Sequence, residues 1–430
     1  MNSPTAFLGL SHLGIVSSIC WSSKGIQVIA LDPDQRLVGD LSRGQFPLYE
    51  PGLAELLDAS RSNIRFSSDL SLLEDCPLII VAADVPTSTD NTSDLNPIQQ
   101  LIDQAVPHLG AGTTLVVLSQ VPPGFTRQLG ARIRSARPGL PFNLLYTVET
   151  LIFGDAVNRS LYPERFIVGL ERSGLSLPPV YEEKLSRFNC PILPMTYESA
   201  ELAKISINIY LIGSVTYANQ LADVCERVGA DWSEITQALR LDKRIGPAAY
   251  IKPSLGVAGG NLERDLATVR DLCRTNDVPA DYLNALAHAN EQRFQWVHRK
   301  LNDLVFQVTP HPNLAVWGLT YKKNTLSTKN SPAIRLISEL NGKAAIKAWD
   351  PAVPELDCGG AVELAASRDD VLDQTDCLLV MADWDEFAEP DLDALRKRMR
   401  RPLIIDCTGL LQQKASELAG IQYVTMGRMT

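Results

Sequence analysis

Two polar residues in the middle of the chain have the types and the spacing to act together on a hydroxyl group. Lys204 and Asn208 are four positions apart in a stretch with few helix breakers, so both side chains lie on one face if the stretch is helical. A lysine amine can take a proton from an alcohol, and an asparagine amide can hold the oxygen or an ordered water. On an arbitrary helix the same pair is a solvated surface feature, and the spacing alone leaves that interpretation open.

A second pattern, near the start of the chain, is typical of a phosphate-binding loop. An apolar stretch leads into a glycine-containing turn in which serine takes the place of the middle glycine of the usual dinucleotide motif. The first glycine can make the tight turn, the last lets a helix pack against a strand, and the amides at the helix N-terminus bind a pyrophosphate. The serine adds a side chain where the phosphates approach, so binding is altered or weakened. The expected cofactor residues of this loop are Gly9, Ser11, His12, Leu13 and Gly14.

The next predicted strand ends in an acidic residue that suits the same cofactor. Asp32 follows Gly14 by eighteen residues. A carboxylate at this point binds the ribose hydroxyls of the adenosine and disfavours a 2′-phosphate. The sequence therefore predicts NAD rather than NADP as cofactor. A Rossmann-like domain that no longer binds a dinucleotide remains the alternative.

The elements that position these residues follow an alternating pattern of short apolar strands and helices. Such alternation predicts βαβ units and a parallel, doubly wound sheet, first in the N-terminal half and again near the C-terminus. We therefore expect an α/β fold with two Rossmann-like, doubly wound domains joined by a long central helix and a helical middle domain. The predicted domains are residues 1–196, 197–303 and 304–430. Predicted strands are Ala6–Leu10, Gln27–Leu31, Leu78–Val81, Thr114–Ser119, Asn143–Tyr146, Leu314–Trp317, Ala345–Trp349, Asp376–Met381 and Leu403–Ile405, and predicted helical stretches are Tyr197–Gly229, Asp265–Asp303 and Pro332–Leu340.

Composition narrows the function classes. With 430 residues, 45% hydrophobic and 21% charged, the chain is a globular protein of two or three domains. A net charge of −10 argues against a general nucleic-acid or anionic-membrane binder. We see no apolar run of about 18 residues and no secretory signal, so we expect a cytoplasmic location and no membrane span. The eight cysteines and five histidines are scattered, which predicts reduced thiols and no metal site.

Five stretches, in order along nearly the whole chain, resemble motifs of the UDP-glucose/GDP-mannose dehydrogenase family. Their collinearity is far more specific than any one motif. The stretches are Phe46-Pro47-Leu48-Tyr49-Glu50-Pro51-Gly52-Leu53 (family PIYEPGL), Val85-Pro86-Thr87 (VPTP), Glu201-Leu202-Ala203-Lys204 through Asn208 (ELVKYAAN), Asp242-Lys243-Arg244-Ile245-Gly246 (DxRIG), and Gly318-Leu319-Thr320-Tyr321-Lys322-Lys323-Asn324-Thr325 followed by Ser331-Pro332 (GLAFKPNTDDxRxSP).

The resemblance implies an NAD domain, a central helix that often forms a dimer interface, and a C-terminal nucleotide-sugar domain. The likeness makes a homodimer and a nucleotide-sugar substrate the expected partners. In that family the C6 alcohol of a UDP- or GDP-sugar is oxidised twice, through an aldehyde and a cysteine thioester, to a carboxylate. Lys204 and Asn208 match the catalytic Lys-x-x-x-Asn of the family, and Asp265 matches an aspartate that could tune the lysine. Its alternative role is a helix N-terminal carboxylate. Glu149 matches the first glutamate of the family's NPEFLREG segment.

The same resemblance assigns the remaining binding residues. Further cofactor contacts are expected at Val85, Thr87, Ser119, Arg264 and Lys329. Substrate contacts are expected at Glu149, Thr150, Leu151, Lys204, Asn208, Tyr250, Lys252, Ser254, Gly256, Tyr321 and Lys322. Lysine and glycine in the loop around Lys252 and Gly256 suit a diphosphate, because one supplies charge and the other lets the backbone approach closely.

Departures from the family pattern lie where the second oxidation takes place. Asn261 stands at the family's cysteine, and an amide nitrogen cannot form a thioester. Phe153 replaces the second glutamate of NPEFLREG, and Gln120 replaces the threonine of the STVPPG turn. Lys329 and Thr408 stand where the family usually has arginines. Neither side chain can form the two parallel hydrogen bonds that an arginine makes with a carboxylate or phosphate.

These departures predict an NAD-dependent oxidoreductase that carries out one alcohol-to-carbonyl step on a nucleotide sugar, UDP-linked rather than GDP-linked. The alternatives are a redox-neutral epimerase that recycles NAD and a catalytically silent protein that binds a nucleotide sugar. Full oxidation with a water activated near Glu149 is a further possibility.

Overall fold

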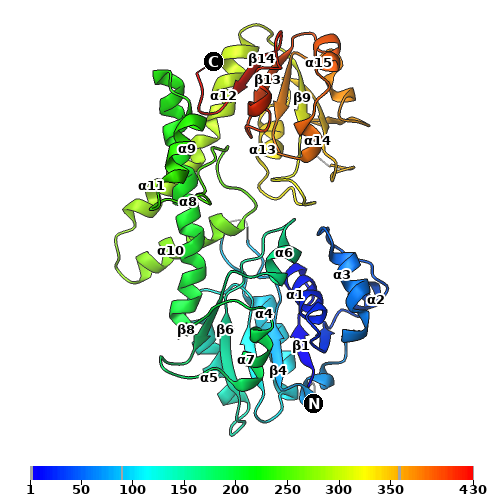
Figure 1. Ribbon diagram of the computed structural model, residues 1–430, viewed down its shortest axis with the longest axis vertical. Helices are drawn as coiled ribbons and strands as arrows, with labels where there is room; N and C mark the ends of the chain where they lie inside the picture. The colour runs from blue at the N-terminus through cyan, green and yellow to red at the C-terminus, as the bar shows by residue number, and fades with distance from the viewer. Residues whose placement is uncertain (1–2, 89–90, 357–359, 430) are drawn as a thin grey trace. The chain divides into compact units, whose positions relative to one another are not determined.

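The computed structural model describes residues 3–88, 91–356 and 360–429. These form two compact units, of which the first ends at Ile207 and the second begins at Asn208 (Figure 1). Within the described residues, no helix is both long enough and apolar enough to span a membrane.

The first unit is built on an eight-stranded sheet with the strand order β3-β2-β1-β4-β5-β6-β7-β8. The first six positions have the Rossmann order 3-2-1-4-5-6, which places a topological switch point between β1 and β4. All neighbouring strands are parallel except β6 and β7. Its main elements are β1 (Thr5–Leu8), α1 (His12–Ser23), β2 (Val28–Leu31), α2 (Gln35–Ser42), α3 (Leu53–Ser60), β3 (Ile64–Ser67), β4 (Leu78–Val81), α4 (Asn96–Ala105), β5 (Thr114–Val117), α5 (Phe125–Ala136), β6 (Asn143–Thr147), α6 (Ala156–Leu161), β7 (Phe166–Leu170), α7 (Pro179–Ser186) and β8 (Ile192–Thr196).

The central strands of this sheet are apolar at nearly every position because helices cover both faces. Along β1, Phe7 belongs to the core shared with α1, whereas Ala6 and Leu8 belong to the core shared with α4. Successive side chains of a strand point to opposite faces, so a sheet buried on both sides needs continuous apolar runs.

A single helix crosses from the first unit to the second. Helix α8 (Tyr197–Val228) has 32 residues and contains both Ile207 and Asn208. The helical part of the second unit continues with α9 (Trp232–Leu241), α10 (Asn261–Thr275), α11 (Asp281–Arg293) and α12 (Gln295–Leu301).

The second unit contains a six-stranded parallel sheet with the order β11-β10-β9-β12-β13-β14. This is the 3-2-1-4-5-6 order again, with its switch point between β9 and β12. Its elements are β9 (Asn313–Trp317), α13 (Pro332–Glu339), β10 (Ala345–Trp349), β11 (Glu363–Leu364), β12 (Cys377–Val380), α14 (Asp385–Ala388), α15 (Leu392–Arg398), β13 (Leu403–Asp406) and β14 (Gln422–Thr425).

The two sheets also share the turn that follows their first strand. Gly9 and Gly318 both have φ +93°, and each donates its N–H to the last residue of the neighbouring strand, Leu31 or Trp349. The predicted fold class, two doubly wound α/β sheets with a helical middle, is confirmed. The expected parallel pairing of the first sheet is interrupted where β7 runs antiparallel to β6.

Candidate functional site

The loop after β1 has the backbone geometry that a dinucleotide pyrophosphate requires. Gly9 adopts φ +93°, a conformation that favours glycine. A Cβ on Gly14 would lie 1.8 Å from the Gly9 carbonyl oxygen, so only glycine allows α1 to approach the strand this closely. This is the backbone geometry of a dinucleotide-binding loop, and the expected cofactor residues Gly9, Ser11, His12, Leu13 and Gly14 all lie in it or at the start of α1.

Two side chains that the usual motif lacks, those of Ser11 and Asp84, meet at this loop. Ser11 is the N-cap of α1 and makes no side-chain cap, because its Oγ instead accepts a 2.7 Å hydrogen bond from the Asp84 N–H. The Asp84 carboxylate accepts from the N–H of Leu13 at 3.3 Å. Asp84 follows β4, on the other side of the switch point, and its side chain is exposed.

Asp32 also contacts the loop directly. One carboxylate oxygen accepts from the Leu10 N–H at 2.7 Å, and the other accepts from the Asp34 N–H at 2.9 Å. In the second sheet, Asp350 holds Leu319 in the same way at 2.7 Å. The shared contact indicates that this aspartate shapes the turn, whichever ligand its remaining lone pairs meet.

His12 connects the loop to a neighbouring turn. Its Nε2 lies 2.7 Å from Oε1 of Glu50, whose side chain is fully buried. Glu50 accepts two more hydrogen bonds, from the N–H groups of Gly154 and Ala156. The rings of His12 and Phe153 pack with centroids 4.2 Å apart. Phe153 therefore forms part of an apolar and hydrogen-bonded support for the start of α1.

The other expected cofactor residues of the first unit lie on the loops after β4 and β5. Val85 is buried, and Thr87 forms an antiparallel bridge with Ser93. Ser119 is buried with its Oγ 3.4 Å from the Val81 carbonyl oxygen. These positions are at the carboxyl ends of the strands, the edge where ligands bind in doubly wound sheets.

Glu149 follows β6 in the same unit and is electrostatically coupled to Lys204. Burial raises the pKa of the Glu149 carboxyl, while a hydrogen bond from the Thr150 N–H and the charge of Lys204 act in the opposite direction. Arg159 fixes the segment by donating to the Thr150 carbonyl at 2.8 Å. Leu151 packs partly buried against the core.

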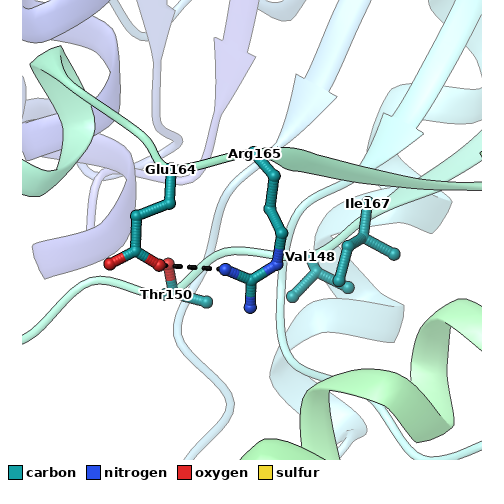
Figure 2. A pocket seen from close by; sticks show the side chains of 5 residues that line it. All are labelled: Val148, Thr150, Glu164, Arg165 and Ile167. Carbon is teal, nitrogen blue, oxygen red and sulfur yellow. Dashed lines mark hydrogen bonds and ion pairs between the residues drawn. The ribbon is translucent and has the colours of Figure 1, made fainter. Parts of the chain in front are cut away.

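A small pocket lies beside this segment, where β6 ends and β7 begins. Figure 2 shows it lined by Val148, Thr150, Glu164, Arg165 and Ile167. Arg165 donates to Glu164 at 2.9 Å across its mouth. Thr150, an expected substrate residue, thus forms part of a hollow in the first unit.

The second unit brings Asn208 and Asp265 together. Asn208 Nδ2 donates to Asp265 Oδ2 at 2.5 Å, and both side chains are buried. Arg264 is buried beside them, with Nε 3.7 Å from Asp265 Oδ1. Lys204 is one helical turn before Asn208 on α8, on the first-unit side of the division. The predicted helix therefore places Lys204 and Asn208 as their spacing requires.

The loop before α10 is held by amide and guanidinium groups of the central helices. Asn219 on α8 accepts from the Ser254 N–H at 2.8 Å, and Arg293 on α11 donates to the Ser254 carbonyl at 2.9 Å. Asn290 accepts from the Val257 N–H at 2.8 Å, and a Cβ on Gly256 would lie 2.7 Å from that amide oxygen. Three side chains therefore hold the backbone of this loop in place.

Other side chains of the same region are half-buried or exposed. Tyr250 is 58% exposed, and Lys252 is exposed with its Nζ 3.6 Å from Asp383. Lys322 lies over the ring of Tyr321 at 5.6 Å. Charged and aromatic side chains on a rigid loop suit the recognition of a phosphorylated ligand.

Two consecutive glycines bring the start of α10 against the second sheet. Gly259 and Gly260 both have φ +94°. A Cβ on Gly259 would lie 2.7 Å from the Tyr321 side chain, and a Cβ on Gly260 would lie 3.2 Å from the Lys329 side chain. Asn261 is the first residue of α10, and its side chain is exposed. In the described parts of the chain, no three His, Cys, Asp or Glu side chains gather to hold a metal ion.

Several residues of these sites escaped the sequence analysis. Asp84, Arg159, Asn219, Asn290 and Arg293 contact expected site segments through hydrogen bonds that span 9 to 71 positions of sequence. Asp84 had one usable signal, an acidic residue just after a strand at the switch point. The others stand on helices as ordinary polar residues, without a pattern that marks them.

Comparison with known proteins matches the chain in three consecutive segments. Residues 4–183 match the NAD binding domain of the UDP-glucose/GDP-mannose dehydrogenase family, residues 198–292 match its central domain, and residues 315–413 match its UDP binding domain. Over 431 aligned residues, the chain is 28% identical to the UDP-glucose 6-dehydrogenase TuaD of Bacillus subtilis (strain 168), covering 98% of this chain and 93% of the relative.

Solved structures show the same fold. A UDP-glucose dehydrogenase from Pyrobaculum islandicum superimposes with a TM-score of 0.85 at 22% identity, over 100% of this chain and 98% of the other. A UDP-D-ManNAc dehydrogenase from Pyrococcus horikoshii gives a TM-score of 0.85 at 20% identity, over 99% of both chains.

Proposed function

Because the chain belongs to the UDP-glucose/GDP-mannose dehydrogenase family, we propose that it is an NAD-dependent oxidoreductase acting on an alcohol of a nucleotide sugar. The match to a UDP binding domain favours a UDP-sugar over a GDP-sugar. Relatives named UDP-glucose 6-dehydrogenase, similar over nearly their whole length, support the same reaction class.

The observation that carries this proposal is the buried hydrogen bond between Asn208 and Asp265, one turn of α8 from Lys204. Buried polar groups are kept only where they are satisfied, and this pair presents an amide oriented by a carboxylate. We assign Lys204 to take the hydroxyl proton or stabilise the oxyanion, and Asn208 to hold that oxygen. Bound NAD supplies the hydride acceptor.

We further propose that the reaction stops after one two-electron step. A second oxidation through a thioester needs a thiolate nucleophile. Asn261 begins α10 at the family's cysteine position, and Cys273, the cysteine on this helix, is twelve residues further along. At about 1.5 Å per residue it lies about 18 Å away along the axis.

The lost acid-forming groups agree with this limit. Phe153 packs on His12, so an aromatic ring takes the place of a carboxylate near the start of α1. Glu149 remains, with a pKa raised by burial. We assign it to hold the sugar or a water, rather than to replace the missing nucleophile.

The test is the number of NADH molecules formed per sugar consumed, with the product identified by mass, over a panel of UDP- and GDP-sugars. The proposal predicts a ratio near one and a carbonyl product. A ratio near two with a carboxylate product would refute the single-step limit. Sugar isomerisation without net NADH would identify an epimerase, and no turnover would identify a silent binding protein.

A further inference from the structure

The N-terminus of α1 is faced by a carboxylate of the chain itself. Asp84 Oδ2 accepts from the N–H of Leu13, the second residue of the helix. The Asp84 N–H in turn donates to Ser11 Oγ at 2.7 Å. The two hydrogen bonds join the loop after β4 to the loop after β1, across the switch point of the sheet.

These are the positions at which a dinucleotide pyrophosphate binds in this fold. Its oxygens accept from the first free N–H groups of the helix and are favoured by the helix dipole. A carboxylate competes for the same donor and the same partial charge, because it is also an anion and a hydrogen-bond acceptor. Both anions cannot occupy the Leu13 N–H together without strong repulsion.

We propose that Asp84 is a built-in competitor for the cofactor pyrophosphate, held in reach by Ser11, and that its side chain must turn away before NAD binds. The inference rests on the proposed NAD-dependent function. Two features make the exchange feasible: the Asp84 side chain is exposed, and its bond to Leu13 is long at 3.3 Å. A long bond at an exposed site is weak, so the carboxylate hinders the cofactor without excluding it.

The serine at the middle position of the loop has a defined part in this arrangement. A glycine there has no hydroxyl to accept from the Asp84 N–H. Ser11 therefore fixes the backbone of Asp84, and the side chain of Asp84 extends from this fixed point to Leu13. Replacing Ser11 by glycine releases the anchor and also removes a side chain from the approach of the phosphates, so its effect on NAD affinity combines both changes, whereas Asp84→Asn tests the carboxylate alone.

The experiment measures NAD affinity by calorimetry on the full chain and on three variants. Asp84→Asn keeps the size of the side chain and an oxygen acceptor but removes the charge. Ser11→Gly removes the anchor, and Asp58→Asn, on the exposed surface of α3, is the control for net charge. ADP-ribose, which contains the pyrophosphate, and adenosine, which does not, serve as additional ligands.

We expect Asp84→Asn to bind NAD and ADP-ribose about tenfold more tightly than the natural chain, and adenosine equally. The gain should shrink at high salt, since the repulsion is screened. Ser11→Gly should also bind NAD more tightly, through the released anchor and the removed side chain, and Asp58→Asn should not.

Unchanged or weaker NAD binding by Asp84→Asn overturns the inference and leaves the proposed function standing. An equal gain for adenosine also overturns it, because the effect would not involve the pyrophosphate. If folded natural chain and variants all fail to bind NAD, the inference and the proposed cofactor fall together. Thermal unfolding of each variant shows whether it is folded.

Discussion

Asn208 and Asp265 are joined by a 2.5 Å hydrogen bond from Nδ2 to Oδ2, although 57 positions separate them in sequence and both side chains are buried. The bond fixes which side of the asparagine amide faces the aspartate. The amide oxygen is then the group that remains for other partners. A residue that holds a reacting hydroxyl group needs a fixed orientation of this kind.

Removing the acceptor of this bond should cost both stability and turnover. Asp265→Ala leaves the buried Asn208 amide without its acceptor, and we expect the free energy of unfolding to fall by about 1–3 kcal/mol. Turnover should fall by about 100-fold or more, as the asparagine loses its orientation. Urea unfolding and initial NADH formation measure the two effects. Asp271→Ala, an exposed aspartate on the same helix, should change stability by less than about 0.5 kcal/mol.

Restoring the thiol alone should not restore acid formation. Asn261 is exposed at the start of α10, so Asn261→Cys can be made without disturbing a core. We expect the NADH-to-sugar ratio to stay near one, because under the proposed single-step limit Phe153 and Gln120 also stand in place of groups of the second step. Mass analysis would detect a covalent sugar on the new cysteine. A ratio that rises to two would show that the thiol was the one missing part.

An exposed apolar stripe on α8 predicts the oligomeric state. Tyr210, Tyr217 and Val224 recur every seven residues, and they are 72%, 48% and 48% exposed. Such a stripe is typical of a helix that packs against a partner, and the family resemblance implies a homodimer. We expect Val224→Glu to raise the dimer dissociation constant at least tenfold, measured by sedimentation or light scattering. Val308→Glu, a comparably exposed valine outside α8, should leave the mass in solution unchanged.

The first unit should lose stability in alkali, with a buried cysteine contributing. Burial raises the pKa of Cys20 from 9.0 to about 12. Between these values the unfolded chain loses the thiol proton while the folded chain keeps it, so stability is full below pH 9 and falls as pH rises. By pH 10.5 the loss from this group is about 2 kcal/mol.

Urea unfolding at pH 8 and pH 10.5 measures that loss. Cys20→Ala should show a shallower decline than the natural chain. Ser18→Ala, a buried neighbour on α1 that does not titrate in this range, should show the natural decline. Parallel declines in all three proteins would mean that Cys20 ionises equally in both states.

The sequence predicted several strands whose pattern comes from burial on two sides, although β7 (Phe166–Leu170), which is buried at every position, was not predicted. Leu78–Val81 was predicted at its observed bounds, because this central parallel strand is apolar and buried throughout. Ala345–Trp349 was also predicted at its observed bounds, although it includes Lys347 and its buried residues alternate with more exposed ones. Strand β8 also escaped prediction. Its five residues are half-buried or exposed and include Pro194, so neither a continuous nor an alternating apolar pattern marks it.

The relation between the two sheets was also beyond the sequence. Both have the order 3-2-1-4-5-6 and the same glycine turn, but the shared contacts depend on few residues, such as Leu10 with Asp32 and Leu319 with Asp350. Two matched residues in each half do not make a detectable repeat. The spacing of Lys204 and Asn208 predicted a common helix, whereas their partners depend on long-range folding.

The division between the units inside α8 has a consequence for how such chains can be recombined. Lys204 and Asn208 stand on successive turns, with the division between Ile207 and Asn208. A junction in a loop would tolerate an added or lost residue, but here one inserted residue turns everything downstream by about 100° and advances it about 1.5 Å. A chimera that takes its sugar-binding half from a relative must therefore be spliced in the same helical phase. A natural exchange of the second unit between relatives must also preserve the helical phase of α8. Substitutions that leave the helix intact are therefore the easier route to a new substrate specificity.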